Sequence, residues 1–113
     1  MHEMSLAEGV RTIIEEAAAA QGFRAVRGVV LEIGELAAVD VDALRFSLEV
    51  VLADTIAAGA TVTVEPVRGS GWCSDCARTV PIRELYDACP HCAGYRVQAS
   101  AGREMRVKAL EVA

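Results

Sequence analysis

Four cysteines arranged as two Cys-x-x-Cys pairs are the strongest chemical signal in this sequence. The first pair is Cys73 and Cys76, the second is Cys89 and Cys92, and the chain contains no other cysteine. Each pair is expected to form a tight turn that brings both sulfur atoms to one side. Four thiolates can then surround a single tetrahedral metal ion. The spacing therefore predicts a four-cysteine zinc site.

Other uses of these cysteines fit the sequence less well, with one exception. Two disulfides are disfavoured because no secretory leader is visible and the chain resembles a cytosolic protein. A thioredoxin-like redox pair is disfavoured because neither Cys-x-x-Cys opens a helix after a hydrophobic strand. Rubredoxin-type iron uses the same ligands, so the sequence leaves iron open beside zinc. Since four sulfur atoms fill the tetrahedron, we predict His91 to be a surface residue and not a ligand.

The first three residues, Met1-His2-Glu3, form a second group of metal-binding atoms. The α-amine of Met1, the amide nitrogen of His2 and a ring nitrogen of His2 can chelate one ion through fused five- and six-membered rings. Glu3 can add its amide or its carboxylate. Deprotonated amides impose a strong planar ligand field, which suits Ni(II) or Cu(II) and not tetrahedral zinc. The simpler interpretation is a solvated histidine near a chain end, and these residues alone favour it.

Length and charge narrow the class of protein. A chain of 113 residues forms one domain, or one domain carrying a small metal-bound lobe. No apolar run approaches the roughly 20 residues that span a bilayer, so we expect a soluble, cytoplasmic protein without a membrane partner. Residues 1–67 carry four arginines and eleven acids, whereas residues 68–113 carry seven basic residues and five acids. This distribution lacks the basic patch of a nucleic-acid-binding zinc ribbon and favours cations and basic protein partners.

Hydrophobic periodicity predicts two helices. The first is expected over residues 5–21, with Ser5 and Glu8 as a capping box and Gly22 as its stop. The second is expected to begin after Asp40, an N-cap candidate, and to end before Gly59. Its predicted buried face consists of Leu44, Leu48, Val51, Leu52 and Ile56.

Short runs rich in β-branched residues predict three strands, over 26–33, over 61–65 with Pro66 as the stop, and over 103–112. Two segments, 69–71 and 99–102, are predicted as linkers that bracket the cysteines. The expected fold class is α+β, a small sheet of about three strands with two helices plus an inserted four-cysteine lobe resembling a zinc ribbon.

The expected domain organisation follows from these linkers. Residues 1–68 and 99–113 are expected to form the α/β core, which contains the candidate nickel ligands of the amino terminus, and residues 69–98 the zinc-binding lobe inserted between strands. A lobe of about 28 residues buries too little surface to fold without its metal. The sequence offers no Ser/His/Asp arrangement, no phosphate-binding glycine-rich loop and no paired catalytic carboxylates, so we predict that the protein is not an enzyme.

Taken together, these motifs resemble the HypA/HybF family of hydrogenase nickel-incorporation proteins. The resemblance covers nearly the whole chain, and its combination of an N-terminal motif, paired cysteines and a closing strand is highly specific. It outweighs the simpler interpretation of the histidine at position 2. The motifs are Met1-His2-Glu3-Met4-Ser5-Leu6, Ile33-Gly34-Glu35-Leu36, Leu44-Arg45-Phe46, the four cysteines, and Gly102-Arg103-Glu104-Met105-Arg106-Val107-Lys108.

The resemblance implies a metallochaperone that delivers Ni(II) to the precursor of the hydrogenase large subunit, together with the GTPase of the same maturation pathway. It implies a nickel site at Met1, His2 and Glu3, with Asp40 as a further carboxylate near the metal. It implies structural Zn(II) on the four cysteines. One departure is Ala93, which follows the last cysteine where the family often has glycine. The oligomeric state, including a homodimer formed by domain swapping of the lobe, stays open.

Overall fold

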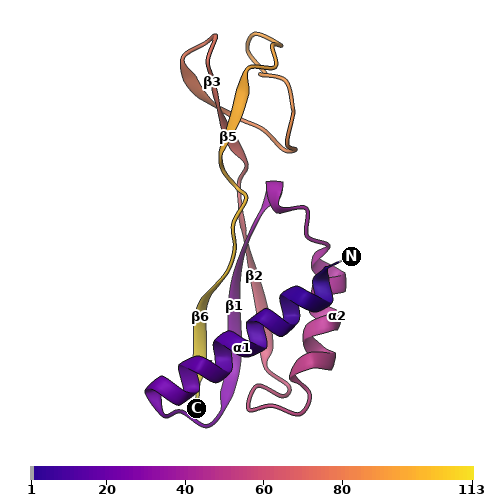
Figure 1. Cartoon of the computed structure of the whole chain (residues 1–113), viewed down its shortest axis with the longest axis vertical. Helices are drawn as coiled ribbons and strands as arrows, with labels where there is room; N and C mark the ends of the chain where they lie inside the picture. Colours follow the sequence, from indigo (N-terminus) through magenta and orange to yellow (C-terminus); the bar gives the residue numbers. More distant parts are fainter. Residues whose placement is uncertain (1) are drawn as a thin grey trace. The chain divides into compact units, whose positions relative to one another are not determined.

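The structure is a computed structural model, and it describes residues 2–113. Within these residues the chain forms two α-helices, one short 3-10 helix and six strands arranged in two three-stranded sheets (Figure 1). The first sheet has the order β2-β1-β6 and the second the order β4-β3-β5. The predicted α+β class, with two helices and a three-stranded sheet, is confirmed. The elements are α1 (Glu3–Gln21), β1 (Val26–Gly34), η1 (Glu35–Ala37), α2 (Val41–Leu52), β2 (Thr61–Val67), β3 (Ser70–Cys73), β4 (Arg78–Pro81), β5 (Val97–Ala101) and β6 (Met105–Val112).

The chain divides into two compact units. One unit, called the core unit below, comprises Met1–Leu31, Val39–Val64 and Val107–Ala113. The other, called the cysteine lobe, comprises Glu32–Ala38 and Glu65–Arg106. No helix within residues 2–113 is long and apolar enough to cross a bilayer.

The core unit is built on the apolar faces of its two helices, which contact each other. Residues spaced by three or four along each helix point the same way, so each helix presents one continuous apolar stripe. These stripes are buried together with side chains of β1. The fully or almost fully buried residues are Ala7, Val10 and Ile14 of α1, Leu44, Leu48 and Leu52 of α2, and Val29 and Leu31 of β1.

The helix ends differ in part from the prediction. The capping box is wrong: α1 begins at Glu3 with His2 as its N-cap and no side-chain cap, which puts Ser5 inside the first turn. The predicted N-cap of α2 is confirmed, because the carboxylate of Asp40 accepts from the backbone N–H of Ala43 at 3.1 Å. That helix ends at Leu52 and not near residue 58. The hydroxyl of Thr55 donates to the Leu52 carbonyl, which closes the last turn.

Both predicted linkers are partly β-structure. Strand β3 begins at Ser70, and β5 runs to Ala101, so residues 99–101 belong to a strand. The two strands pair antiparallel, with Gly71 opposite Ala99 and a register irregularity next to it. The prediction also ended the 61–65 strand too early. Strand β2 continues through Pro66, which is tolerated because β2 lies at an edge of its sheet.

Three glycines in the cysteine lobe allow backbones to approach closely. A Cβ atom on Gly34 would lie 1.9 Å from the carbonyl oxygen of Gly102, and one on Gly69 would lie 2.3 Å from that of Ile82. Two hydrogen bonds hold the segment 34–36 against the segment 102–104, and we call this close approach the glycine crossing. Gly34 N–H donates to the Glu104 carbonyl and Leu36 N–H donates to the Gly102 carbonyl, both at 2.7 Å. The Gly34-to-Leu36 segment is thereby fixed to the lobe.

We expect Gly34→Ala to destabilise the protein by about 3 kcal/mol or more, because the backbone must move apart to admit the methyl group. Gly9→Ala is the matched control, since no atom other than the backbone of the same helix and the two neighbouring residues lies within 4 Å of the new Cβ. It should stabilise the protein by about 0.5–1 kcal/mol. Chemical denaturation followed by circular dichroism measures both changes. Equal midpoints for the two variants would contradict the close approach.

Candidate metal centre

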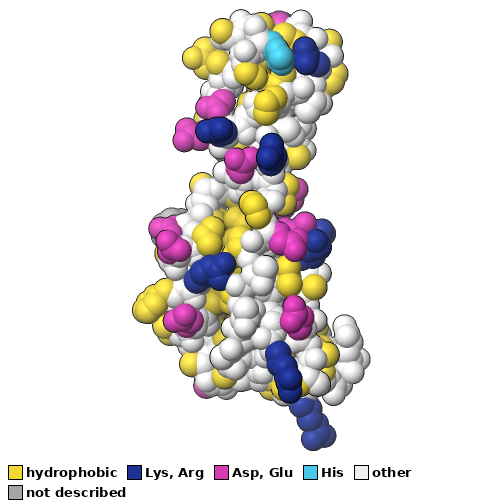
Figure 2. Space-filling model, turned by 180° about the vertical axis from the view of Figure 1, so that it is seen from behind, with side chains coloured by type: hydrophobic (Ala, Val, Ile, Leu, Met, Phe, Trp, Pro, Cys, Tyr) yellow, Lys and Arg dark blue, Asp and Glu magenta, His cyan; other side chains and the backbone are white. Residues whose placement is uncertain are grey.

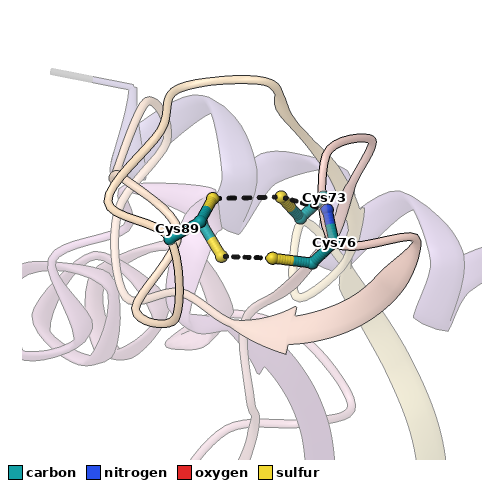
Figure 3. A group of neighbouring side chains, drawn as sticks. Cys73, Cys76 and Cys89 are labelled. Carbon is teal, nitrogen blue, oxygen red and sulfur yellow. Dashed lines mark hydrogen bonds between the residues drawn. The ribbon is translucent and has the colours of Figure 1, made fainter.

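The four cysteine sulfur atoms lie together in the cysteine lobe. All four Sγ atoms are within 4.8 Å of one another. The Cys73 and Cys92 sulfurs are 3.7 Å apart, and the Cys76 and Cys89 sulfurs are 3.9 Å apart. Figure 3 shows the labelled sulfurs pointing toward a common centre. Tetrahedral thiolate coordination at about 2.3 Å requires sulfur separations of about 3.8 Å, so the cluster fits a four-coordinate metal ion.

Short local turns place the sulfurs. Cys73 is the last residue of β3, and the turn after it returns the backbone N–H of Cys76 to the Cys73 sulfur at 3.4 Å. In the second pair, the N–H of His91, two residues after Cys89, lies 3.4 Å from the Cys89 sulfur. Such N–H groups stabilise negative charge on a coordinating thiolate. Each Cys-x-x-Cys is therefore a pre-formed half of the site.

Two of the cysteines are buried in an apolar cluster, and an ion pair links the two cysteine turns at the surface. Cys73 and Cys89 are 0% and 1% exposed. They form one apolar cluster with Leu36, Val80 and Ile82. At the surface of the lobe, the guanidinium of Arg96 donates to the carboxylate of Asp75 at 2.9 Å. Because Asp75 lies inside the first pair and Arg96 follows the second, this contact joins the two turns.

The thiols perturb one another strongly. A hydrogen bond with the Cys92 sulfur, together with burial, raises the pKa of Cys76 to about 12. The backbone N–H of Cys92 lowers the pKa of Cys89 to about 7. Four thiolates at these distances repel one another unless a cation lies between them. The donor set therefore fits a divalent cation that displaces the thiol protons.

The residue after each pair adopts a left-handed backbone. Ala77 has φ of 50° and Ala93 has φ of 61°. Ala93 is the position noted above as a departure from the family that the sequence resembles. The left-handed region costs an L-residue with a Cβ atom roughly 1–2 kcal/mol relative to glycine. The departure thus leaves the ligand set intact and places strain in the turn.

We expect Ala93→Gly to stabilise the metal-loaded lobe by about 1 kcal/mol, because glycine adopts positive φ without this strain. Ala99→Gly, in the paired strand β5, is the matched control and should destabilise the lobe. Denaturation followed by the fluorescence of Trp72, the single tryptophan of the chain, reports on the lobe. A shift of the same sign in both variants would contradict the strain at position 93.

A second polar group lies where α1 and α2 begin. The Glu3 side chain is 8% exposed, and its Oε2 accepts from the backbone N–H of Asp40 at 3.2 Å. The Nδ1 atom of His2 is buried and has no hydrogen-bond partner among residues 2–113. The structure thus brings Glu3 and Asp40 together, and it leaves one ring nitrogen of His2 available. Met1 lies outside the described residues.

The electrostatics of Glu3 keep it ionised. Hydrogen bonds to the carboxylate, among them one from the backbone N–H of Asp40, lower the pKa of the Glu3 carboxyl to about 2. The carboxylate is thus negatively charged at any pH near neutrality. A buried carboxylate that stays ionised is a group that a cation would stabilise.

The remaining predicted residues have simple placements. His91 is exposed, as predicted for a surface residue next to the metal site. The contribution of the Ile33–Leu36 motif was not predicted: Leu36 belongs to the apolar cluster of the lobe, and a Glu35 carboxylate oxygen accepts from Gly69 N–H at 2.7 Å. In the sequence these residues only follow a predicted strand, and nothing local shows that they pack against the cysteines.

Comparisons with known proteins agree with this arrangement. The family model described as "Hydrogenase/urease nickel incorporation, metallochaperone, hypA" matches residues 1–112. The hydrogenase maturation factor HypA of Azoarcus sp. (strain BH72) is 62% identical over 110 residues, covering 97% of this chain and 96% of the relative. HypA of Azotobacter chroococcum mcd 1 is 52% identical over 112 residues, covering 99% of both chains.

Solved structures are similar as well. The solution structure of the Ni metallochaperone HypA from Helicobacter pylori superposes with a TM-score of 0.71 at 26% identity, covering 99% of this chain and 97% of that chain. The structural similarity covers residues of both units, and the family model matches almost the whole chain. This chain belongs to the HypA family of hydrogenase/urease nickel-incorporation metallochaperones and is not an enzyme.

Proposed function

We propose that this protein binds one Ni(II) ion at its amino terminus and delivers it to the precursor of the hydrogenase large subunit. The observation that carries the proposal is the buried, unpartnered Nδ1 atom of His2. This atom is the ring nitrogen that closes a six-membered chelate with the backbone amide of the same residue. Family membership and the four-cysteine site support the same conclusion.

The proposed ligands are the α-amine of Met1, the amide nitrogen and Nδ1 of His2, and a contribution from Glu3. The first intrahelical hydrogen bond of α1 runs from Leu6 N–H to the His2 carbonyl at 2.9 Å. The amide N–H of His2 therefore precedes the helix and has no role in its ladder. It can lose its proton to a metal without breaking α1. The resulting nitrogen-rich planar field favours Ni(II) over Zn(II).

We propose that Asp40 acts near this site. Its backbone N–H orients the carboxylate of Glu3, and one of its own carboxylate oxygens caps α2. A further carboxylate at the nickel would come from its remaining oxygen. The N-cap role means that Asp40→Asn should keep α2 intact, because asparagine caps helices about as well as aspartate.

The proposed ion of the cysteine lobe is structural Zn(II), held by Cys73, Cys76, Cys89 and Cys92. Four sulfur ligands leave no open position, so the ion would supply binding energy to the lobe and no Lewis-acid chemistry. The same ligands hold iron in rubredoxin-type sites. Metal analysis distinguishes the two, and a colourless protein containing one zinc per chain is the expected result.

Delivery is tested by a transfer experiment. The protein is loaded with one equivalent of Ni(II), mixed with nickel-free large-subunit precursor in the presence or absence of the maturation GTPase, and separated by affinity purification of the precursor. Nickel should appear on the precursor faster than from free Ni(II) buffered to the same concentration. Nickel that stays on the chaperone, or that arrives equally fast from buffer, would contradict the carrier role.

A further inference from the structure

The solvent-facing side of α2 carries apolar side chains that the core does not use. Phe46 is 65% exposed and Val50 is 52% exposed, although both belong to a helix whose other face is almost completely buried. They are four positions apart in the helix, so they are neighbours on one face. Together with the exposed Asp42, Glu49 and Ala53, they form what we call the α2 outer face. Neighbouring exposed apolar side chains with polar residues around them are typical of an interaction surface.

An apolar groove adjoins this face. It has a volume of about 420 Å³ and lies between the C-terminal half of α2 and the turns that lead into β2. Glu49 lines it as well, and is the charged residue among its lining side chains. The α2 outer face and the groove therefore form one continuous surface, because they share Glu49 and Ala53. This surface is mainly apolar and has the Glu49 carboxylate at its border. The groove is lined by Leu48, Leu52, Ala53, Ala57, Ala60 and Val62.

The charges on this surface are mainly acidic. Asp42 and Glu49 flank the exposed aromatic along α2. Arg45, the only basic residue of α2, directs its guanidinium to the Val62 carbonyl at 2.5 Å. Arg11 of α1 donates to the Val51 carbonyl at 3.4 Å and to Asp54 at 3.5 Å. In Figure 2 the side of the core unit that carries α2, at the left, shows hydrophobic and acidic side chains next to each other.

We propose that the α2 outer face and its groove bind an amphipathic helix of a partner protein, with apolar anchors one turn apart and Lys or Arg beside them. A helix fits because its i, i+4 anchors match the ridge of Phe46 and Val50 and the groove next to it. A strand added to the neighbouring edge of β2 fits less well, because Pro66 lacks the N–H that pairing requires.

The charges of this surface also disfavour the binding of a second copy of the same chain to it. A two-fold interface would place the Asp42 and Glu49 carboxylates of both copies around one apolar centre, where like charges repel. A cationic partner gains from the same carboxylates. The proposal is independent of nickel at the amino terminus, since it uses only residues of α2, the following turns and β2.

Two fluorescent 18-residue peptides with the same leucine pattern test it, one flanked by lysines and one by glutamates. Fluorescence anisotropy with the full-length protein should show binding of the lysine peptide that weakens as salt increases. We expect Phe46→Ser to weaken this binding at least about tenfold. Ile13→Ser, at an exposed position of α1, is the matched control and should leave the affinity unchanged. The double variant Asp42→Lys/Glu49→Lys should prefer the glutamate peptide.

Three results would overturn the proposal. The first is no binding of the lysine peptide to the native protein. The second is binding that Phe46→Ser and Ile13→Ser weaken equally, which would indicate nonspecific attraction to an acidic protein. The third comes from sedimentation: a native dimer that Phe46→Ser converts to a monomer would show that a second copy covers this face. Circular dichroism confirms that the exposed substitutions leave each variant folded.

Discussion

A His2→Ala variant is expected to lose at least about 100-fold in Ni(II) affinity while it keeps its zinc and its fold. Loss of a residue that only orients a metal ligand typically costs 10–100-fold, so loss of a ligand should cost more. An N-terminal tag left in place should weaken nickel binding to a similar degree. The tag converts the α-amine into an ordinary amide, which has no basic lone pair to donate. Calorimetric titration with Ni(II) and metal analysis measure both effects.

The pH dependence of nickel binding identifies which groups lose protons. Glu3, with a pKa of about 2, is already ionised and contributes no change near neutrality. The amine, the amide and the imidazole must all lose protons before they can bind the metal. Protons therefore compete with the metal, and affinity should fall as the pH drops from about 7.5 to about 5.5. A profile flat over this range would indicate that carboxylates dominate the site.

His91→Ala is the matched control for the nickel prediction, because it removes the other histidine of the chain from an exposed position. It should bind one Ni(II) with native affinity. The planar field predicts a yellowish, low-spin Ni(II) spectrum. The assignment of nickel to the amino terminus is wrong if the tagged protein, or the variant lacking His2, binds Ni(II) as tightly as the native chain.

Cys76→Ala should abolish zinc binding and unfold the cysteine lobe, while the core unit stays folded. The lobe depends on its metal because its apolar cluster of buried residues contains only five side chains, and two of these are the ligands Cys73 and Cys89. Structural zinc contributes roughly 10–16 kcal/mol in small zinc domains, which is more than such a cluster supplies. The core unit has its own buried core of helical and strand residues, so it does not require the ion.

Zinc content, Trp72 fluorescence and amide spectra measure this outcome. The tryptophan lies in β3, so its emission should shift as the lobe unfolds. Amide signals of α1 and α2 should keep their native positions. Ser74→Ala lies inside the same Cys-x-x-Cys turn and removes no ligand, so it should retain one zinc per chain. An ordered lobe in the zinc-free variant would show that the metal does not hold it.

The sequence alone determined the features that depend on local interactions. Each Cys-x-x-Cys closes its own turn, which directs the sulfurs of one pair to one side, and Asp40 caps α2 because its side chain reaches a backbone N–H three residues away. The apolar spacing of both helices reflects a period set by the backbone itself. The residue types at the amino terminus allow a nickel chelate, but only the resemblance to a known family favoured it over a solvated histidine, and their role stays a prediction.

Tertiary structure decided what depends on residues far apart in the chain. Helix α1 begins at Glu3, whose carboxylate accepts a hydrogen bond from the backbone N–H of Asp40, 37 residues away. Capping rules use only neighbouring residues, so they cannot predict this contact. The segment 99–101 became a strand because β3 offered it a partner, although its small residues resemble a linker. Leu36 packs against the buried cysteines because the close approach of Gly34 to Gly102 places it there. Such contacts arise only when distant segments meet, so the energy that fixes them is absent from any local window of sequence.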